Sequence, residues 1–394
     1  MHRLKTVRGI LRAPVIAGLL ILLQSQVAGA TDVYWSGFGF DGEFAAAEGR
    51  YPNSFALSRQ MQGDRPILDM YLGEKAQAVD NKSFQIVFDK GSIGPDAPFS
   101  IALGFVLDRE TVSVEPIGDK YKVLVTLSAQ AMFFDFKEMA VVSTYPFSMN
   151  YIHAQSKRPT QQDIREIVEN MYIGAGKENL FDHFVTVLSE ARLNTRVSRR
   201  IQVTSVTVDP SVKDRLPPVW RDDMDDFSVF LSQQFGRFLS EQQNVPVLPT
   251  VKGHAIGNRM SASFSDGRVF DLEIPEADYS IALSLKKLVK IEYAKVAAGT
   301  SFIYGSYLGV KAVEPLSGRP YIDTTIKNGE VKKVPADQTY VDDWPAYQDS
   351  ILMLFSKFAS EIDSPSKDWV EKHIGDMSVR KQLSEFGKVV QSCR

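Results

Sequence analysis

The chain of 394 residues contains very little cysteine or histidine, and this scarcity excludes several kinds of protein. Because Cys393 is the one cysteine, no disulfide can form within the chain, and its stability must come from a packed core. We expect this terminal thiol to be either free on a frayed end or paired with another molecule. No HExxH motif or Cys–His array occurs, so we expect no metal site and no cofactor. After the first 30 residues, the histidines are widely spaced, at positions 153, 183, 254 and 373.

The sequence also has no excess of basic residues and, after residue 30, no long apolar run. The first 30 residues hold four of the 45 lysines and arginines and no acid, which leaves 41 basic residues against 48 acids, a net charge of -7. An acidic chain lacks the attraction to phosphate on which nucleic-acid binders depend, so we expect no nucleic-acid partner. A membrane-spanning helix needs about 20 apolar residues, and no stretch approaches that length.

The N-terminus has the pattern of a secretory signal peptide. Four basic residues lie within residues 1–12, an unbroken apolar segment covers 15–23, and Ala28-Gly29-Ala30 is a small-x-small cleavage site. We expect cleavage near Ala30 and a periplasmic or secreted location; the alternative is a short anchor that is not removed. A lipoprotein cysteine does not follow the cleavage site.

Most candidate catalytic motifs are incomplete. Gly174-Ala175-Gly176-Lys177-Glu178 lacks the glycine spacing and the Ser or Thr of a phosphate-binding loop, so we interpret it as a helix end. The acids between Asp222 and Asp226 offer calcium ligands, but acids at a helix N-terminus explain them better. No Gly-x-Ser-x-Gly motif occurs. We therefore predict no catalytic residues.

The hydrophobic pattern alternates between strand and helix periodicity. The predicted helices cover 164–172, 180–191, 227–239, 343–358, 369–374 and 379–390, with Thr160 and Asp343 as N-caps. Ser265-Asp266-Gly267 predicts a hairpin turn. The predicted strands cover 32–40, 84–88, 100–114, 121–129, 132–136, 140–149, 201–208, 245–251, 260–264, 268–274, 279–288, 302–313 and 321–326.

The order of these elements suggests that one unit occurs twice. Phe99-Ser100-Ile101-Ala102-Leu103 matches Tyr279-Ser280-Ile281-Ala282-Leu283, and each is followed by a long strand, a hairpin and a helix. We predict an α+β fold, with two similar units of mixed β-sheet packed on helices and a C-terminal helical segment. The predicted parts are the signal peptide (1–30), the first unit (31–210), the second unit (211–362) and the C-terminal helices (363–394).

The segment from Ala277 to Leu283 resembles the alanine-aspartate-tyrosine signature of CsgG-type curli-secretion proteins. The activator LpoB and the N-terminal domain of TolB share that type of fold. The stretch 310–319 is similar to the hairpin turn of these families, with Arg319 where an acid is usual. The resemblance covers about residues 225–360 and, more loosely, 31–195. It implies an envelope binding or assembly module.

The segment from Met132 to Phe136 is the one feature that suggests a binding surface. Met132, Phe133, Phe134 and Phe136 place apolar side chains on both faces of a strand, where they could contact a partner. The alternative is that these residues belong to the core of an ordinary buried sheet, and the alternation favours that interpretation.

These observations leave three functional hypotheses. The first is an exported, non-enzymatic periplasmic envelope protein that binds another envelope protein through a sheet edge or the aromatic hairpin. The second is an outer-membrane secretion ring or channel component, for which the segment 121–149 could supply a hairpin that leaves the soluble domain. The third is a hydrolase with a site assembled from scattered carboxylates. The oligomeric state is left open.

Overall fold

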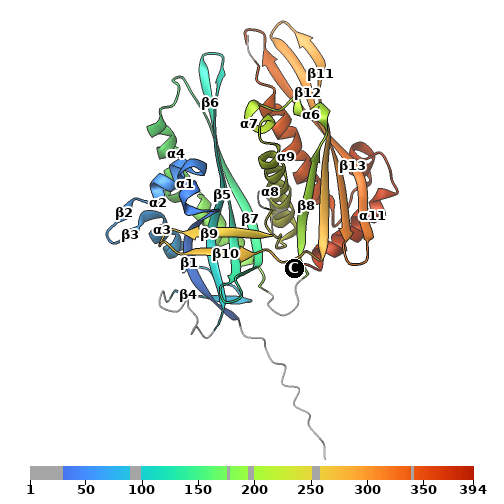
Figure 1. Ribbon diagram of the computed structural model, residues 1–394. Coiled ribbons are helices and arrows are strands. Elements are labelled where there is room, and N and C mark those ends of the chain that lie inside the picture. Colours follow the sequence, from blue (N-terminus) through green and yellow to red (C-terminus); the bar gives the residue numbers. More distant parts are fainter. Residues whose placement is uncertain (1–29, 89–98, 175–177, 194–198, 251–257, 339–340) are drawn as a thin grey trace, which may run out of the picture.

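A computed structural model describes residues 30–88, 99–174, 178–193, 199–250, 258–338 and 341–394. The fold is α+β, as the sequence predicts, with two mixed β-sheets that both pack against helices (Figure 1). The predicted helix end at Gly174 is correct, because α4 ends at Ile173, whereas 175–177 lie outside the described residues.

The first sheet has a central part of four strands in the order β1-β5-β6-β7, and β4 lies beside β1. Strands β1 and β5 are parallel, whereas β5, β6 and β7 form an antiparallel meander. Five helices cover one face with a core rich in phenylalanine. The strands are β1 (Thr31–Asp41), β4 (Phe84–Val87), β5 (Ile101–Ile117), β6 (Lys120–Asp135) and β7 (Ala140–Gln155), and the helices are α1 (Phe44–Arg50), α2 (Pro52–Ser58), α3 (Ile67–Ala76), α4 (Gln161–Ile173) and α5 (Leu180–Glu190). A short hairpin, β2 (Met61–Gln62) and β3 (Arg65–Pro66), precedes α3.

A hairpin from much later in the chain covers the lower part of the other face. It consists of β9 (Arg259–Phe264) and β10 (Val269–Glu273), and the predicted turn at Ser265-Asp266-Gly267 joins them, with Gly267 at a φ of 90°. Strand β9 pairs with β1 and β10 pairs with β7, so the hairpin closes the sheet around a second apolar core. Gly104 is required there, because a Cβ at this position would lie 2.5 Å from the Phe264 ring.

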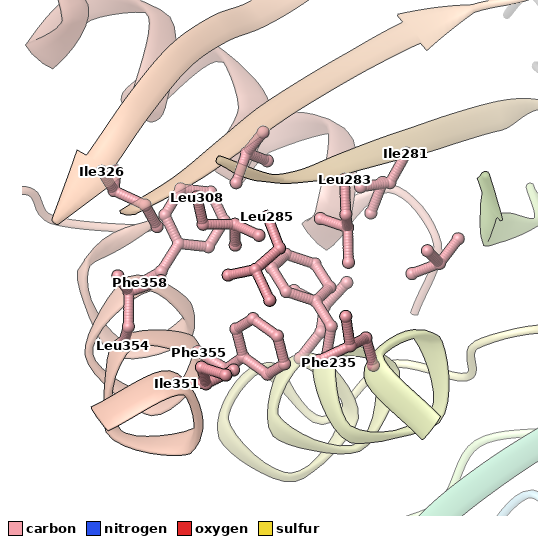
Figure 2. Packing of buried hydrophobic residues seen from close by; sticks show 14 of the residues in the cluster. Phe235, Ile281, Leu283, Leu285, Leu308, Ile326, Ile351, Leu354, Phe355 and Phe358 are labelled. Carbon is pink, nitrogen blue, oxygen red and sulfur yellow. The ribbon is translucent and has the colours of Figure 1, made fainter. Parts of the chain in front are cut away.

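The second sheet has four strands in the order β13-β12-β11-β8 and one helical layer. Figure 2 shows how leucine and isoleucine side chains of the sheet meet Phe235 of α8 and Phe355 and Phe358 of α9. The strands are β8 (Ile201–Val208), β11 (Tyr279–Val296), β12 (Gly299–Glu314) and β13 (Arg319–Pro335), and the helices are α6 (Pro210–Lys213), α7 (Pro218–Arg221), α8 (Met224–Gln243), α9 (Trp344–Glu361), α10 (Lys367–His373) and α11 (Val379–Gln391).

The two sheets follow the same path, which is the similarity that the sequence predicts. In each sheet, a first strand lies parallel to the opening strand of a three-stranded meander, and helices follow the meander. The matching pentapeptides lie at the start of β5 and of β11, so they occupy equivalent positions.

The expected boundary at residue 210 would place residues before it in the first sheet and residues after it in the second. The chain instead crosses from one sheet to the other several times. Strand β8 pairs with β11 in the second sheet, and the β9–β10 hairpin belongs to the first sheet. The prediction of a strand at 245–251 is wrong for its described part. Leu248 forms only an isolated bridge to Gln202, because this segment divides its hydrogen bonds between two sheets.

That segment, Val245–Thr250, connects the sheets and is called the bridging segment below. The Val247 amide donates to the Thr144 carbonyl of β7 at 2.9 Å, and the Thr144 hydroxyl donates to the Val247 carbonyl. On the other side, the Leu248 amide donates to the Ile201 carbonyl of β8 at 2.9 Å. Buried backbone groups of this kind are costly to separate, so the segment holds β7 and β8 in fixed positions.

Arg109 of β5 makes a second connection between the sheets. Its Nη2 donates to Gln233 Oε1 at 3.0 Å, its Nη1 lies 3.4 Å from Asp226 Oδ2, and its guanidinium lies 5.7 Å from the Trp220 ring and 5.5 Å from the Phe230 ring. Only 11% of this side chain is exposed, which strengthens its interactions with charges and rings.

Each meander extends beyond its parallel first strand as a three-stranded ribbon. Strand β1 pairs with β5 only as far as Leu107, and β8 pairs with β11 only as far as Leu285. The strand ends beyond these points form ribbon 1 (109–128 and 148–155) and ribbon 2 (286–307 and 327–335). Both ribbons project toward the top of Figure 1. The predicted strands 279–288 and 321–326 are therefore too short.

The C-terminal residue is anchored and not frayed. Cys393 is 1% exposed, and the Arg394 guanidinium donates to the Gln243 carbonyl at 2.8 Å. Burial raises the pKa of the Cys393 thiol to about 12, so the thiol stays protonated. Both expectations for this residue assumed an accessible thiol, and this burial contradicts them.

The closure of the first sheet predicts an asymmetric effect of two substitutions in one hairpin. Phe264 is fully buried against Phe134 and Phe270, so Phe264→Ala should lower the free energy of unfolding by about 3–5 kcal/mol. Val269 is 51% exposed, and Val269→Ala should change it by less than about 0.5 kcal/mol. Urea unfolding of the two variants measures the difference. Equal effects would show that the hairpin does not close the core.

Candidate functional site

The four predicted partner-contact residues lie inside the protein. Met132, Phe133 and Phe134 have no exposed surface, and Phe136 is 9% exposed. Phe133 packs against Phe84 in the first core, whereas the other three belong to the core under the β9–β10 hairpin. The structure therefore corresponds to the alternative interpretation, in which the strand alternation fills two cores, and none of the four forms a binding surface in this conformation.

A hollow lies between the ends of the two ribbons. It has a volume of about 400 Å³, and it is called the groove below. Consecutive residues of β5 and of β13 line it, so the groove follows the edges of these strands as well as their faces. The lining residues that carry the argument are Val114–Ile117 of β5, Lys122 of β6, Lys332–Val334 of β13 and Ala346 and Asp349 of α9.

Among the described residues, neither strand edge at the groove has a pairing partner. Strand β5 has no partner on this side beyond Leu107, because the pairing with β1 stops there, and β13 is the edge strand of the second sheet. Unpaired edges present amide and carbonyl groups to which another extended chain can bond. Pro116 and Pro335 stand near the strand ends, where proline restricts uncontrolled pairing.

The charges of the groove are balanced and largely paired. Lys122 Nζ lies 3.7 Å from Glu115 Oε2, and Lys332 Nζ lies 2.7 Å from Asp349 Oδ2. Three lysines and three acids line the groove in all, so its charge selects neither a cation nor an anion. It suits a ligand that alternates polar and apolar groups, as a polypeptide does.

Asp343, next to the groove, has a different role from the predicted helix cap. Its side chain makes no capping bond; it accepts from the Tyr304 hydroxyl at 2.6 Å and from Lys290 Nζ at 2.7 Å. Asp342 Oδ1 accepts from the Trp344 amide instead. Burial and the hydrogen bond to Asp343 raise the pKa of Tyr304, so the phenol remains a donor at neutral pH. The predicted cap at Thr160 is present, and Asp223, one of the acids assigned to a helix N-terminus, caps α8.

Two buried acids lie at the junction of the sheets, below the groove. Asp41 and Asp108 are each 7% exposed and line a cavity of about 30 Å³, the space of one or two water molecules. Asp41 Oδ2 lies 3.5 Å from Arg50 Nη2. Asp108 Oδ1 has no hydrogen-bond partner among the described residues.

Burial raises the pKa of both carboxyls. For Asp108, burial and then the nearby charge of Asp41 raise the pKa from 3.8 to about 7, although Arg109 opposes the change. Burial also raises the pKa of Asp41, against the charge of Arg50. A cavity of this size holds no substrate, and no histidine lines it. The pair therefore affects the stability of the junction and does not form a site that can bind a substrate.

The described residues bring no other reactive groups together. His153 is exposed, His183 lies beside the Phe147 ring, and His373 Nδ1 bonds to the Lys327 carbonyl, while His254 is outside the described residues. Across the described ranges, no three His, Cys, Asp or Glu side chains could hold a metal ion together. Within the same ranges, no helix is long and apolar enough to cross a membrane.

Comparison with known proteins gives weak results. No protein-family model and no curated protein sequence matches the chain. A minor lipoprotein from Acinetobacter baumannii is similar at 10% identity over 42% of this chain and 88% of its own, with a TM-score of 0.21. A Xanthomonas campestris protein of the DUF330 family is similar at 12% identity over 50% of this chain and 93% of its own, with a TM-score of 0.19. Such scores carry no argument about function, and neither protein is described as CsgG-, LpoB- or TolB-like.

The raised pKa of Asp108 predicts how stability depends on pH. Because the folded pKa lies above the unfolded value, the folded state holds this proton more tightly between about pH 4 and 7. The contribution of protonated Asp108 to the free energy of unfolding is fully present below about pH 4. It decreases as the pH rises and is lost once the pH has passed the folded pKa of about 7. Relative to Asp108→Asn, the wild type should lose on the order of 3–4 kcal/mol across that interval.

Urea unfolding at pH 4.5 and at pH 8 measures this difference. Asp119→Asn, in the exposed turn between β5 and β6, is the matched control and should leave the profile unchanged. Parallel profiles for the wild type and Asp108→Asn would show that this carboxyl does not titrate in the folded state.

Proposed function

We propose that the chain is an exported, non-enzymatic periplasmic envelope protein that acts as a binding or assembly module. The N-terminal pattern supports export. Strand β1 begins at Thr31, directly after Ala30, so cleavage there would leave every described strand and helix intact. The mature chain would therefore keep both sheets and the groove.

The unpaired strand edges at the groove carry the binding part of the proposal. An extended segment of another envelope protein can add to the edge of β13 or of β5, with main-chain hydrogen bonds for affinity and groove side chains for specificity. Such a ligand needs no charge of one sign, in agreement with the balanced lining. The partner is therefore a protein with an exposed extended segment.

The same observations give less support to the two alternatives. For a hydrolase, the buried acids adjoin a cavity of about 30 Å³, and the groove acids Glu115 and Asp349 are paired with lysines. For a channel component, the hairpin at 121–149 would need a face free for lipid. Its residues from Leu127 to Phe134 instead pack into cores on both faces of the sheet.

Filling the groove should abolish partner binding. Ala346 lies at the start of α9 and lines the groove, so Ala346→Trp would place an indole where the partner segment lies. Met353, on the same helix, is 43% exposed and does not line the groove, which makes Met353→Trp the matched control. Cross-linking in the periplasm, followed by purification of the tagged mature chain, should recover one discrete partner with the wild type and the control, and at least tenfold less with Ala346→Trp.

Equal recovery with the two tryptophan variants would remove the groove from the proposal. Recovery of the chain alone in all three cases would contradict a binding role. Thermal unfolding of each variant shows whether a loss of binding reflects a loss of fold.

A further inference from the structure

The second sheet has one face that no described helix covers. Helices α8, α9 and α11 all pack against the opposite face, where their side chains form one core with Leu283, Leu285 and Leu308. Because side chains alternate along a strand, the residues next to these point away from the helices. In ribbon 2, this uncovered face is formed by the upper parts of β11, β12 and β13.

The centre of this face is a row of aliphatic side chains. Ile291 of β11 pairs with Ile303 of β12, which pairs with Val331 of β13, so the three stand side by side across the ribbon. Ile291 is 53% exposed and Val331 is 59% exposed. Val296, nearer the tip, is 60% exposed. Exposed apolar residues grouped in this way usually mark an interaction surface.

Glycines keep the face flat. Gly305 and Gly329 are opposite each other in the next row. A Cβ on Gly305 would lie 2.7 Å from Val289 Cγ2, and one on Gly329 would lie 3.1 Å from Ile303 Cγ2. Because Gly305 and Gly329 have no Cβ atoms, the side chains of Val289 and Ile303 pack directly over the glycine backbone. The face is therefore an even aliphatic surface.

Lysines surround the aliphatic row. Lys287 and Lys327 flank Tyr307 on the side toward the body of the protein, and Lys333 stands beyond Val331 toward the tip. None of the three lysines forms an ion pair with a described residue. The two acids of this stretch, Glu292 and Glu330, stand opposite Phe302 and Tyr304 and so belong to the other face. The uncovered face is therefore positive, although the whole chain is acidic.

We propose that this face docks on the surface of an anionic phospholipid bilayer. The face is called the basic apolar face and consists of Lys287, Val289, Ile291, Ile303, Lys327, Val331 and Lys333. Its ammonium groups would meet lipid phosphates, while the aliphatic row enters the boundary between headgroups and acyl chains. A flat aliphatic centre suits a bilayer better than a peptide, which needs pockets for its side chains.

This docking goes beyond the proposed protein binding and does not depend on it. The basic apolar face points away from the helical layer, and none of its residues except Lys333 lines the groove. The groove and the basic apolar face are therefore tested with different substitutions and different measurements, which are partner recovery for the groove and vesicle flotation for the face.

Vesicle flotation of the mature chain, residues 31–394, tests the docking. The wild type should float with vesicles of phosphatidylglycerol and phosphatidylethanolamine, should stay behind with vesicles of phosphatidylcholine alone, and should be released by 0.5 M salt. Replacing Lys287, Lys327 and Lys333 by glutamine should weaken binding on the order of 100-fold, since each lysine near an anionic surface contributes about fivefold. The double variant Ile291→Ser and Val331→Ser should also float less.

The matched control replaces Lys367, Lys372 and Lys381, three exposed lysines of α10 and α11, by glutamine and should float as the wild type does. All substituted residues are exposed, and thermal unfolding checks that each variant folds. Equal flotation of the two triple variants, or binding to neutral vesicles as well, would overturn the proposal. No flotation, together with retention of the wild type on immobilised polyglutamate, would assign the face to an acidic protein and would overturn it too.

Discussion

The structure depends on how the bridging segment divides its backbone hydrogen bonds. In Val245–Thr250, Val247 bonds to Thr144 in the first sheet, and Leu248 bonds to Ile201 in the second. The backbone groups of a strand normally bond to neighbours in the same sheet. Here successive residues point their amides in opposite directions, so one bonds to the first sheet and the next bonds to the second. With Arg109 held between α8 and the Trp220 ring, this makes the two similar units one body, although their cores are separate.

This junction determines what the upper part of the molecule can do. Each ribbon lacks helical cover at its end and so offers strand edges and uncovered faces. Because the bridging segment connects β7 and β8, the ends of β5 and β13 lie on either side of one groove. The opposite side of ribbon 2 is free to meet a flat surface. This shape leaves one side for the proposed protein segment and the other for the proposed membrane contact. The raised pKa values of the buried Asp41 and Asp108 predict that the stability of the junction depends on pH.

Local sequence signals predicted the elements well and their associations poorly. Alternation and capping located the long strands, the helix cap at Thr160 and the turn at Gly267, and the matching pentapeptides indicated two similar units. The pairing of β9 with β1 was not predictable, because these strands are more than 200 residues apart and a hairpin signal does not identify its neighbours. The ribbon ends were missed for a local reason: Asn328-Gly329 is typical of a turn but lies within β13, where Gly329 leaves room for Ile303. Alternation of Val289, Ile291 and Tyr293 was the available signal for this extension. The groove has no sequence signature, since its lining residues become neighbours only when the sheets pack.

The central claim is that the two ribbons are held at one separation by the junction. Pulsed electron-spin-resonance spectroscopy tests it directly, with spin labels attached to cysteines introduced at Asp119, in the turn of ribbon 1, and at Lys295, near the tip of ribbon 2, while the buried Cys393 is replaced by serine. The account predicts a single narrow distance distribution, which becomes broad when Arg109→Leu removes the contacts to Gln233 and Asp226. A broad distribution in the parent chain, or one that Arg109→Leu leaves unchanged, would contradict it.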